Sequence, residues 1–136
     1  MDLNECLKKG FLKRTATNKA LINSLLSLSD VKEKTVKKAI IDEENIPVYV
    51  SVAYDSLREI LEAISISKGY KVLSHICIGE LMKKLFPPFD HSSFDRFRWI
   101  RNGINYYGRK IGFEQGKEII KLIFELKKES LRLLPK

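Results

Sequence analysis

Residues 94–108 read FDRFRWIRNGINYYG and set three arginines among five aromatic residues at the spacing of a single helix. Four side chains fall on nearly one face of this helix, and Arg98 lies beside them: Phe97, Arg101, Ile104 and Asn105. An arginine on an apolar face is either paired with a carboxylate or available to bind a phosphate. The role of this segment therefore depends on which partner its arginines have.

The guanidinium groups of Arg98 and Arg101 can bind a phosphate through a planar fork, and the amide of Asn105 can add a donor or orient an arginine. The alternative is structural: the arginine pairs with a carboxylate of the preceding central helix and supports the bundle. The candidate carboxylates are Asp55, Glu59 and Glu62. The aromatic residues Phe94, Phe97 and Trp99 are expected to pack in the core or at a dimer interface.

Helical periodicity continues on both sides of this segment, and no stretch alternates like a β-strand. Helices are expected at about residues 3–9, 17–39, 45–67, 74–86, 90–107 and 114–134, with Thr17, Asn45 and Ser74 near their starts. The third helix carries apolar residues on two faces, which predicts a central helix buried on more than one side. The apolar stripe expected on the second helix is Leu21, Leu25, Leu28, Val31, Thr35 and Ala39.

The short connections predict one all-α domain over residues 1–136, an up-and-down antiparallel bundle of four main helices plus short extra helices. A net charge of +8 would attract nucleic acid, an acidic protein or an anionic membrane surface. The first residues do not have the pattern of a signal peptide, and no apolar stretch is long enough to span a membrane. A soluble, cytoplasmic protein is expected, with Cys6 and Cys77 reduced and packed.

Catalytic motifs are few in this chain. It has no glycine-rich phosphate loop, no nucleophile elbow and no cysteine or histidine cluster with metal-ligand spacing. Of the two histidines, His75 lies at a helix start, where a capping or surface role is favoured over catalysis, and His91 is expected to be exposed. No metal and no cofactor are expected.

Residues 101–106, RNGINY, resemble the R-x4-6-H motif of the HEPN family (higher eukaryotes and prokaryotes nucleotide-binding). The preceding order is similar too: a central helix ends at residues 68–71, KGYK, and Ser74-His75 opens the next helix. The opening residues 6–12, CLKKGFL, followed by a long charged helix, resemble stand-alone archaeal and bacterial members.

The resemblance implies an up-and-down helical bundle that dimerises, with the motif helices of two subunits facing each other across a cleft. In active members the arginine and the histidine cleave RNA without a metal. The histidine moves protons, and the arginine stabilises the charge of the phosphorane. Other members bind nucleotides or partner a minimal nucleotidyltransferase.

The sequence departs from the motif where the histidine is expected, because Tyr106, Tyr107 and Gly108 occupy those positions. A tyrosine with a pKa of about 10 is a poor general base at neutral pH. The resemblance therefore favours a homodimer that binds RNA or a nucleotide at an arginine-lined interface cleft, with ribonuclease activity weak or lost. The residues expected to bind are Arg98, Arg101, Asn102, Asn105 and Tyr107, and those expected in any catalysis are Arg101, Tyr106 and His75.

Three alternatives stay open. The protein could be an active ribonuclease toxin of a toxin–antitoxin system, with His75 or Tyr106 replacing the missing histidine. It could be the interaction partner of a nucleotidyltransferase. It could also be a purely structural helical dimer, which is favoured if Arg101 is buried against a carboxylate.

Overall fold

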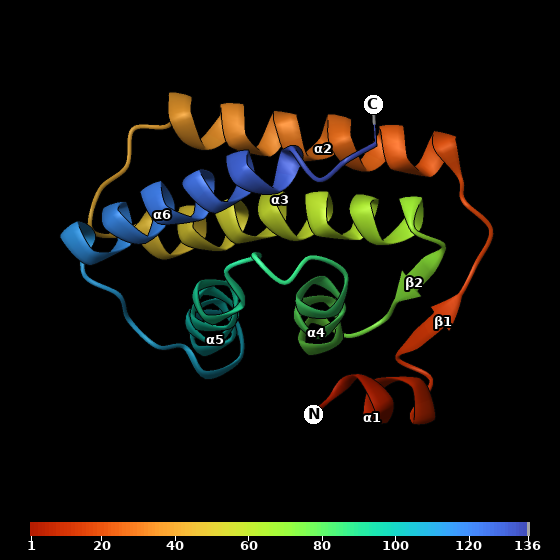
Figure 1. Cartoon of the computed structure of the whole chain (residues 1–136). Helices are drawn as coiled ribbons and strands as arrows, with labels where there is room; N and C mark the ends of the chain where they lie inside the picture. Colours follow the sequence, from red (N-terminus) through yellow and green to blue (C-terminus); the bar gives the residue numbers. More distant parts are fainter. Residues whose placement is uncertain (136) are drawn as a thin grey trace.

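A computed structural model describes residues 1–135, which form six helices and two short strands. In chain order these are α1 (Leu3–Lys8), β1 (Leu12–Arg14), α2 (Lys19–Lys38), α3 (Ile46–Ser67), β2 (Tyr70–Val72), α4 (His75–Leu85), α5 (His91–Tyr107) and α6 (Phe113–Leu131). Three long helices, α2, α3 and α6, lie side by side, and α4 and α5 cross beneath α3 (Figure 1). The all-α class and the helical bundle are confirmed.

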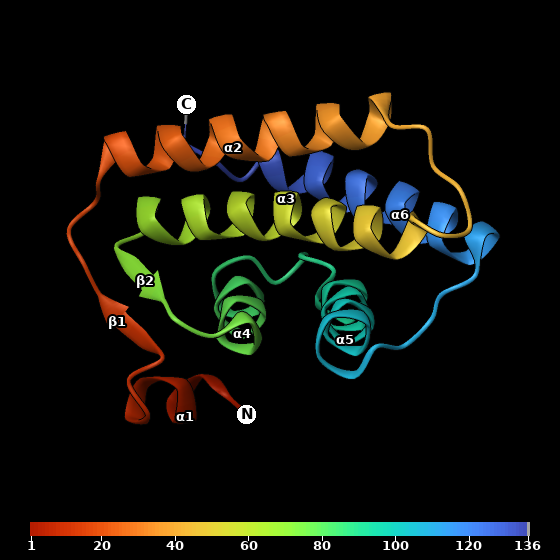
Figure 2. The ribbon, with the colours of Figure 1, turned by 180° about the vertical axis from the view of Figure 1, so that it is seen from behind.

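The direction of α6 differs from the antiparallel prediction. Helix α2 runs opposite to α3, whereas α6 runs in the same direction as α3 (Figures 1 and 2). The cause is the transverse pair of helices: after α3 the chain passes through β2, α4 and α5 beneath it, and so returns to the end of the bundle where α3 began. Helix α6 then starts beside the start of α3.

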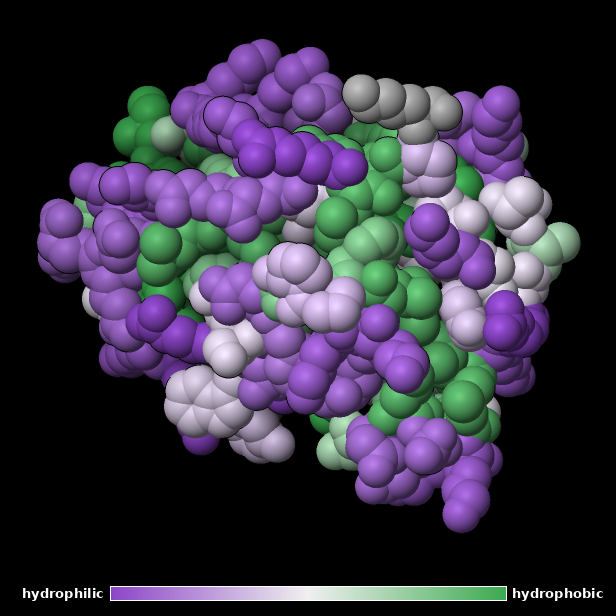
Figure 3. All heavy atoms as spheres, viewed as in Figure 1, coloured by the Kyte–Doolittle hydropathy of each residue, from purple (hydrophilic) through white to green (hydrophobic). Residues whose placement is uncertain are grey.

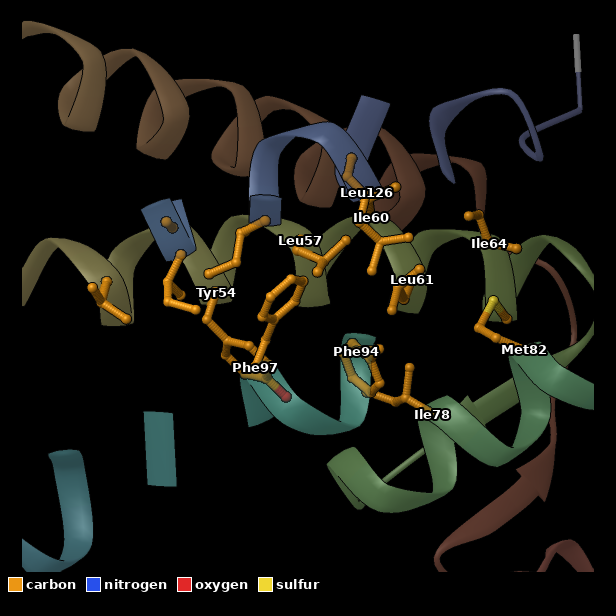
Figure 4. Close-up of a cluster of buried hydrophobic side chains, with 14 of the residues drawn as sticks. Tyr54, Leu57, Ile60, Leu61, Ile64, Ile78, Met82, Phe94, Phe97 and Leu126 are labelled. Atoms are coloured by element: carbon orange, nitrogen blue, oxygen red, sulfur yellow. The ribbon is translucent and has the colours of Figure 1, made fainter. Parts of the chain in front are cut away.

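Helix α3 is the centre of the core. Its side chains point both toward α2 and α6 and toward α4 and α5, as Figure 4 shows for Tyr54, Leu57, Ile60 and Leu61. Each of these four side chains is at most 1% exposed. The expectation of a helix buried on more than one side is confirmed. Because α3 is held on both sides, its polar residues have fixed positions relative to α5.

Two short strands were missed by the helical reading of the sequence. Strands β1 and β2 pair antiparallel, with Leu12 opposite Val72 and Arg14 opposite Tyr70. The backbone N–H of Thr15 extends the pairing by donating to the carbonyl of Gly69 at 2.9 Å. Three residues are too few to show a period-2 pattern, and the two strands lie far apart in the chain, so periodicity could not reveal them.

The apolar stripe expected on α2 is wrong. Leu21, Leu28 and Val31 are exposed, whereas Ser29 and Val36 are buried. The hydroxyl of Ser29 donates to the carbonyl of Ser56 on α3 at 2.6 Å. Small residues at this contact let the two helices approach closely. The hydrogen bond satisfies the buried hydroxyl, so Ser29 can be buried although its polarity predicts a position in solvent.

The expectation of two reduced cysteines is also wrong. Cys6 and Cys77 form a disulfide bond, and both residues are fully buried. The strand pairing brings the first segment of the chain back against α4, which places the two cysteines 5.9 Å apart between Cα atoms. That separation is ordinary for a disulfide. The bond fastens α1 to the first turns of α4.

Of the helices that the structure describes, none combines the length and apolar character that crossing a membrane requires. The surface seen in Figure 3 is largely hydrophilic, with apolar side chains gathered near α4 and the end of α6. A shallow hollow lies between the α4–α5 connection and the end of α6. It is lined in part by Phe86, Phe89, Leu126 and Leu133.

Candidate functional site

The arginines of α5 meet a row of polar residues on α3. Asp90 caps α5 by accepting from the backbone N–H of Ser93 at 3.1 Å, and Phe94 and Phe97 are buried in the core. These anchors turn the face of α5 that carries Arg98 and Arg101 toward α3, on the side where α4 also begins. The resulting group, called here the inner cluster, consists of Tyr54, Asp55, Arg58 and Glu62 of α3, His75 of α4, and Asp95, Arg98 and Arg101 of α5.

Arg101 lies between the carboxylate of Asp55 and the phenol of Tyr106. Its Nη2 donates to Oδ1 of Asp55 at 3.3 Å and its Nη1 donates to the hydroxyl of Tyr106 at 3.4 Å. Its Cζ lies 5.7 Å from the ring centroid of Tyr54 and 5.8 Å from that of Tyr106. The side chain is 14% exposed. Arg101 is thus mostly buried against a carboxylate, which is the arrangement that the structural alternative anticipated.

The other two arginines of the inner cluster have closer partners. Arg58 donates to Glu62 at 2.6 Å, and Arg98 donates to Asp95 at 2.7 Å. Three arginines therefore face three carboxylates, Asp55, Glu62 and Asp95, and the fixed charges of the cluster cancel. Among the described residues, Nε of Arg58 and Nε of Arg101 are buried without a hydrogen-bond partner.

His75 occupies the side of the cluster formed by α4. Its Nδ1 lies 3.2 Å from the hydroxyl of Tyr54. Burial and the positive charges of Arg58, Arg101 and Arg98 together lower the pKa of His75 to about 4, with burial the largest cause. Burial likewise raises the pKa of the Tyr54 phenol. At neutral pH the imidazole is therefore uncharged and the phenol protonated, so the hydroxyl can donate to Nδ1.

The remaining residues expected at the site lie at its edge or outside it. Asn105 is exposed, and its Oδ1 accepts a hydrogen bond from the hydroxyl of Ser51 at 2.7 Å. Asn102 is half-buried, while Tyr106 and Tyr107 are 69% and 76% exposed. The structure thus brings Arg98, Arg101 and His75 into the inner cluster and places Tyr106 at its edge, in contact with Arg101. It places Tyr107 on the outer surface of α5.

Some members of the cluster could be expected from the sequence and some could not. Asp55 was one of three candidate partners of Arg101. Tyr54 and Arg58 were missed, because a tyrosine on the apolar stripe of a buried helix gives no sign that its hydroxyl meets a histidine. The expectation that His91 is exposed is wrong, since it is half-buried, with Nε2 3.5 Å from Oε1 of Glu80.

Within residues 1–135, histidine, cysteine, aspartate and glutamate side chains form no group of three or more that could hold a metal ion. Comparison with protein-family models, with curated proteins and with solved structures finds no match. The function has to be argued from the site.

Proposed function

We propose that this protein is a HEPN-like homodimer that binds RNA or a nucleotide through Arg101 and its neighbours on α5, and that it has little or no ribonuclease activity. The observation that supports it most is the loose pairing of Arg101. Its two hydrogen bonds, at 3.3 and 3.4 Å, are longer than those of Arg58 and Arg98, at 2.6 and 2.7 Å.

An arginine with a purely structural role is expected to make short or bidentate contacts, as Arg58 does with Glu62. Arg101 instead makes one contact to a single carboxylate oxygen and one to an exposed phenol. A phosphate oxygen would bind this guanidinium more strongly than the Tyr106 hydroxyl does, because both partners would be charged. The net charge of +8 supports an anionic ligand of this kind.

We expect little RNA cleavage because neither candidate general base, His75 or Tyr106, is suited to accept a proton at neutral pH. General base catalysis is most effective when the pKa of the base lies near the working pH. His75, with a pKa of about 4, is a weak base, and Tyr106 replaces the family histidine. The ribonuclease toxin stays an alternative because neutral His75 and Arg101 belong to one cluster.

The test is the affinity for a labelled single-stranded RNA, measured by fluorescence anisotropy over a range of salt concentrations. Arg101→Ala should raise Kd about tenfold and reduce the slope of log Kd against log salt by about 1. Lys8→Ala, which removes an exposed charge on α1, should change neither quantity comparably. Circular dichroism confirms that each variant is folded, and a mass measurement in solution tests the dimer.

Asp55→Asn distinguishes a ligand-binding role of Arg101 from a structural role as the ion-pair partner of Asp55. If Asp55 competes with the ligand for the guanidinium, its neutralisation should lower Kd roughly threefold. Equal affinity of wild type and Arg101→Ala would contradict the proposal and favour the structural alternative. The same RNA, incubated in EDTA and analysed on a gel, should stay intact. Cleavage that Arg101→Ala abolishes would identify the ribonuclease instead.

A nucleotidyltransferase partner remains a separate proposal, supported only by the family resemblance. A stable complex that copurifies with such an enzyme, while the wild-type chain does not bind RNA, would favour it.

A further inference from the structure

The outward face of α5 carries aromatic side chains that the core does not use. Trp99 is 57% exposed and Tyr107 is 76% exposed. Arg96, Trp99, Gly103 and Tyr107 recur at helical spacing on this face, which is opposite the face that carries Arg101. The aromatic residues Phe94 and Phe97, in contrast, are buried as expected.

Arg109 is held across this face by the local backbone. Gly108 ends α5 in the left-handed conformation, at φ 60°, and the chain then turns back so that the N–H of Arg109 donates to the carbonyl of Gly103 at 2.9 Å. The Arg109 side chain lies over Gly103: a Cβ added there would come within 2.9 Å of Cδ of Arg109.

The guanidinium of Arg109 is thereby placed between two rings. Its Cζ lies 4.5 Å from the ring centroid of Trp99 and 5.8 Å from that of Tyr107. Such cation–π contacts orient an arginine without neutralising its charge. Gly103 makes the arrangement possible because a side chain at that position would occupy the space of Arg109.

Arg109 also differs from the arginines of the inner cluster in its charge balance. Each inner arginine pairs with a carboxylate. Within residues 1–135, no carboxylate oxygen lies within 4.0 Å of a charged nitrogen of the exposed Arg96, Arg109 or Lys110. The outward face of α5 and the turn after it thus combine oriented aromatic rings with cations that form no ion pair within residues 1–135.

We propose that this outer surface, formed by Arg96, Trp99, Tyr107, Arg109 and Lys110, binds single-stranded RNA. An unpaired base stacks on Trp99 or Tyr107, and the cations contact the adjacent phosphates. The inference rests on the proposed function, and it adds that the RNA is single-stranded and that a second surface of the protein contacts it. Stacking on a protein ring requires an unstacked base, which a continuous duplex does not offer.

Charge favours this ligand over a second copy of the chain. A two-fold interface centred on this surface would bring Arg96, Arg109 and Lys110 close to their own copies, and like charges would repel. A polyanion has the complementary charge.

Trp99 is the only tryptophan of the chain, so its fluorescence reports directly on stacking at this surface. A 12-nucleotide single-stranded RNA should quench the emission, and a blunt duplex with the same number of phosphates should quench it much less. In anisotropy measurements, Trp99→Ala and Arg109→Ala should each raise Kd about tenfold. Lys8→Ala serves as the charge-matched control.

Gly103→Ala tests the arrangement without removing any ring or charge. The added methyl group displaces the Arg109 side chain, so Kd should rise roughly fivefold while the helix stays folded. Binding without quenching, together with unchanged affinity in Trp99→Ala and Arg109→Ala, would overturn the outer surface as the binding site.

The failures of the two proposals are distinguishable. If Arg101→Ala loses affinity and Arg109→Ala does not, the Arg101 site stands and the outer surface is overturned. If the reverse holds, the outer surface stands and the Arg101 site is overturned. A wild-type chain that binds no RNA overturns both. A dimer that Trp99→Ala dissociates would show that a second copy, and not RNA, covers this surface.

Discussion

His75 is partly buried beside Tyr54, and burial disfavours its charged form. The nearby Arg58, Arg101 and Arg98 disfavour that form further, whereas Asp55 opposes them. Protonation of its ring is therefore unfavourable in the folded state. The pKa of about 4 lies below the ordinary value of 6.5, so the unfolded chain binds this proton more readily. The contribution of neutral His75 to stability is present above pH 6.5 and is lost as the pH falls from 6.5 to 4.

We expect wild type to lose more free energy of unfolding between pH 7 and pH 4.5 than His75→Gln does, by about 1–2 kcal/mol after allowance for the exposed part of the ring. Urea unfolding at several pH values measures this difference. His91→Gln, which removes the other histidine, is measured beside it as the matched variant. An equal pH dependence in wild type and His75→Gln would contradict the lowered pKa.

The sequence predicted which side chains lie together in the site only where they are close in sequence on one helix. The grouping of Arg98, Arg101 and Asn105 could be derived from helical periodicity, and Asp55 was among the expected partners. The contact between His75 and Tyr54 could not, because it depends on α4 crossing beneath α3. The position of Arg109 likewise depends on two features. One is the left-handed backbone of Gly108, which a glycine at a helix end suggests, and the other is the free space over Gly103, which the sequence does not indicate.

At the level of elements, α6 packs against α3 through a glycine. A Cβ at Gly116 would overlap Cγ1 of Ile46, which is fully buried at the start of α3. Neither backbone can move freely, because α3 is held on its opposite face by α4 and α5 (Figure 1). This contact fixes how closely the two parallel helices approach.

Gly116→Ala should therefore destabilise the fold by about 2 kcal/mol through overpacking, despite the better helix propensity of alanine. Thermal or urea denaturation measures the change. Gly112→Ala is the control, since no heavy atom lies within 4 Å of a Cβ there and only a helix-capping preference of less than about 1 kcal/mol is lost. A larger loss at Gly112 than at Gly116 would argue against close packing of α6 on α3.

Helices could be located from the sequence because caps, glycines and prolines mark their ends, as Asp90, Gly108 and the Pro87-Pro88 pair do around α5. Which face of a helix is buried was harder to predict. Helix α2 buries Ser29 and exposes Leu28, because close approach and hydrogen bonding to α3 outweigh side-chain hydrophobicity at that contact.

For the whole molecule, the largest departure from expectation is the disulfide between Cys6 and Cys77, which closes a loop over 71 positions of the chain. Two cysteines this far apart in the sequence carry no spacing signal. Their pairing depends on β1 meeting β2, an interaction that is itself invisible to periodicity.

Removal of this bond in Cys6→Ser/Cys77→Ser should lower the free energy of unfolding by about 3–4 kcal/mol, because the unfolded chain regains the entropy of an open loop. Thermal denaturation with and without reductant measures the loss, and reductant should not affect the double variant. A thiol assay on denatured protein that was kept oxidised should detect no free thiol. Two reactive thiols in that sample would contradict the bond.

The disulfide also divides the inner cluster into two covalently different parts. Residues 6–77 form a closed ring of chain that contains Tyr54, Asp55, Arg58, Glu62 and His75. Helix α5, with Arg98 and Arg101, lies outside that ring and is held against it by noncovalent contacts, chiefly the packing of Phe94 and Phe97. If α5 separated from the bundle, Arg98 and Arg101 would leave the cluster, while the residues within the ring would stay close together. Whether the site is complete therefore depends on the packing of Phe94 and Phe97.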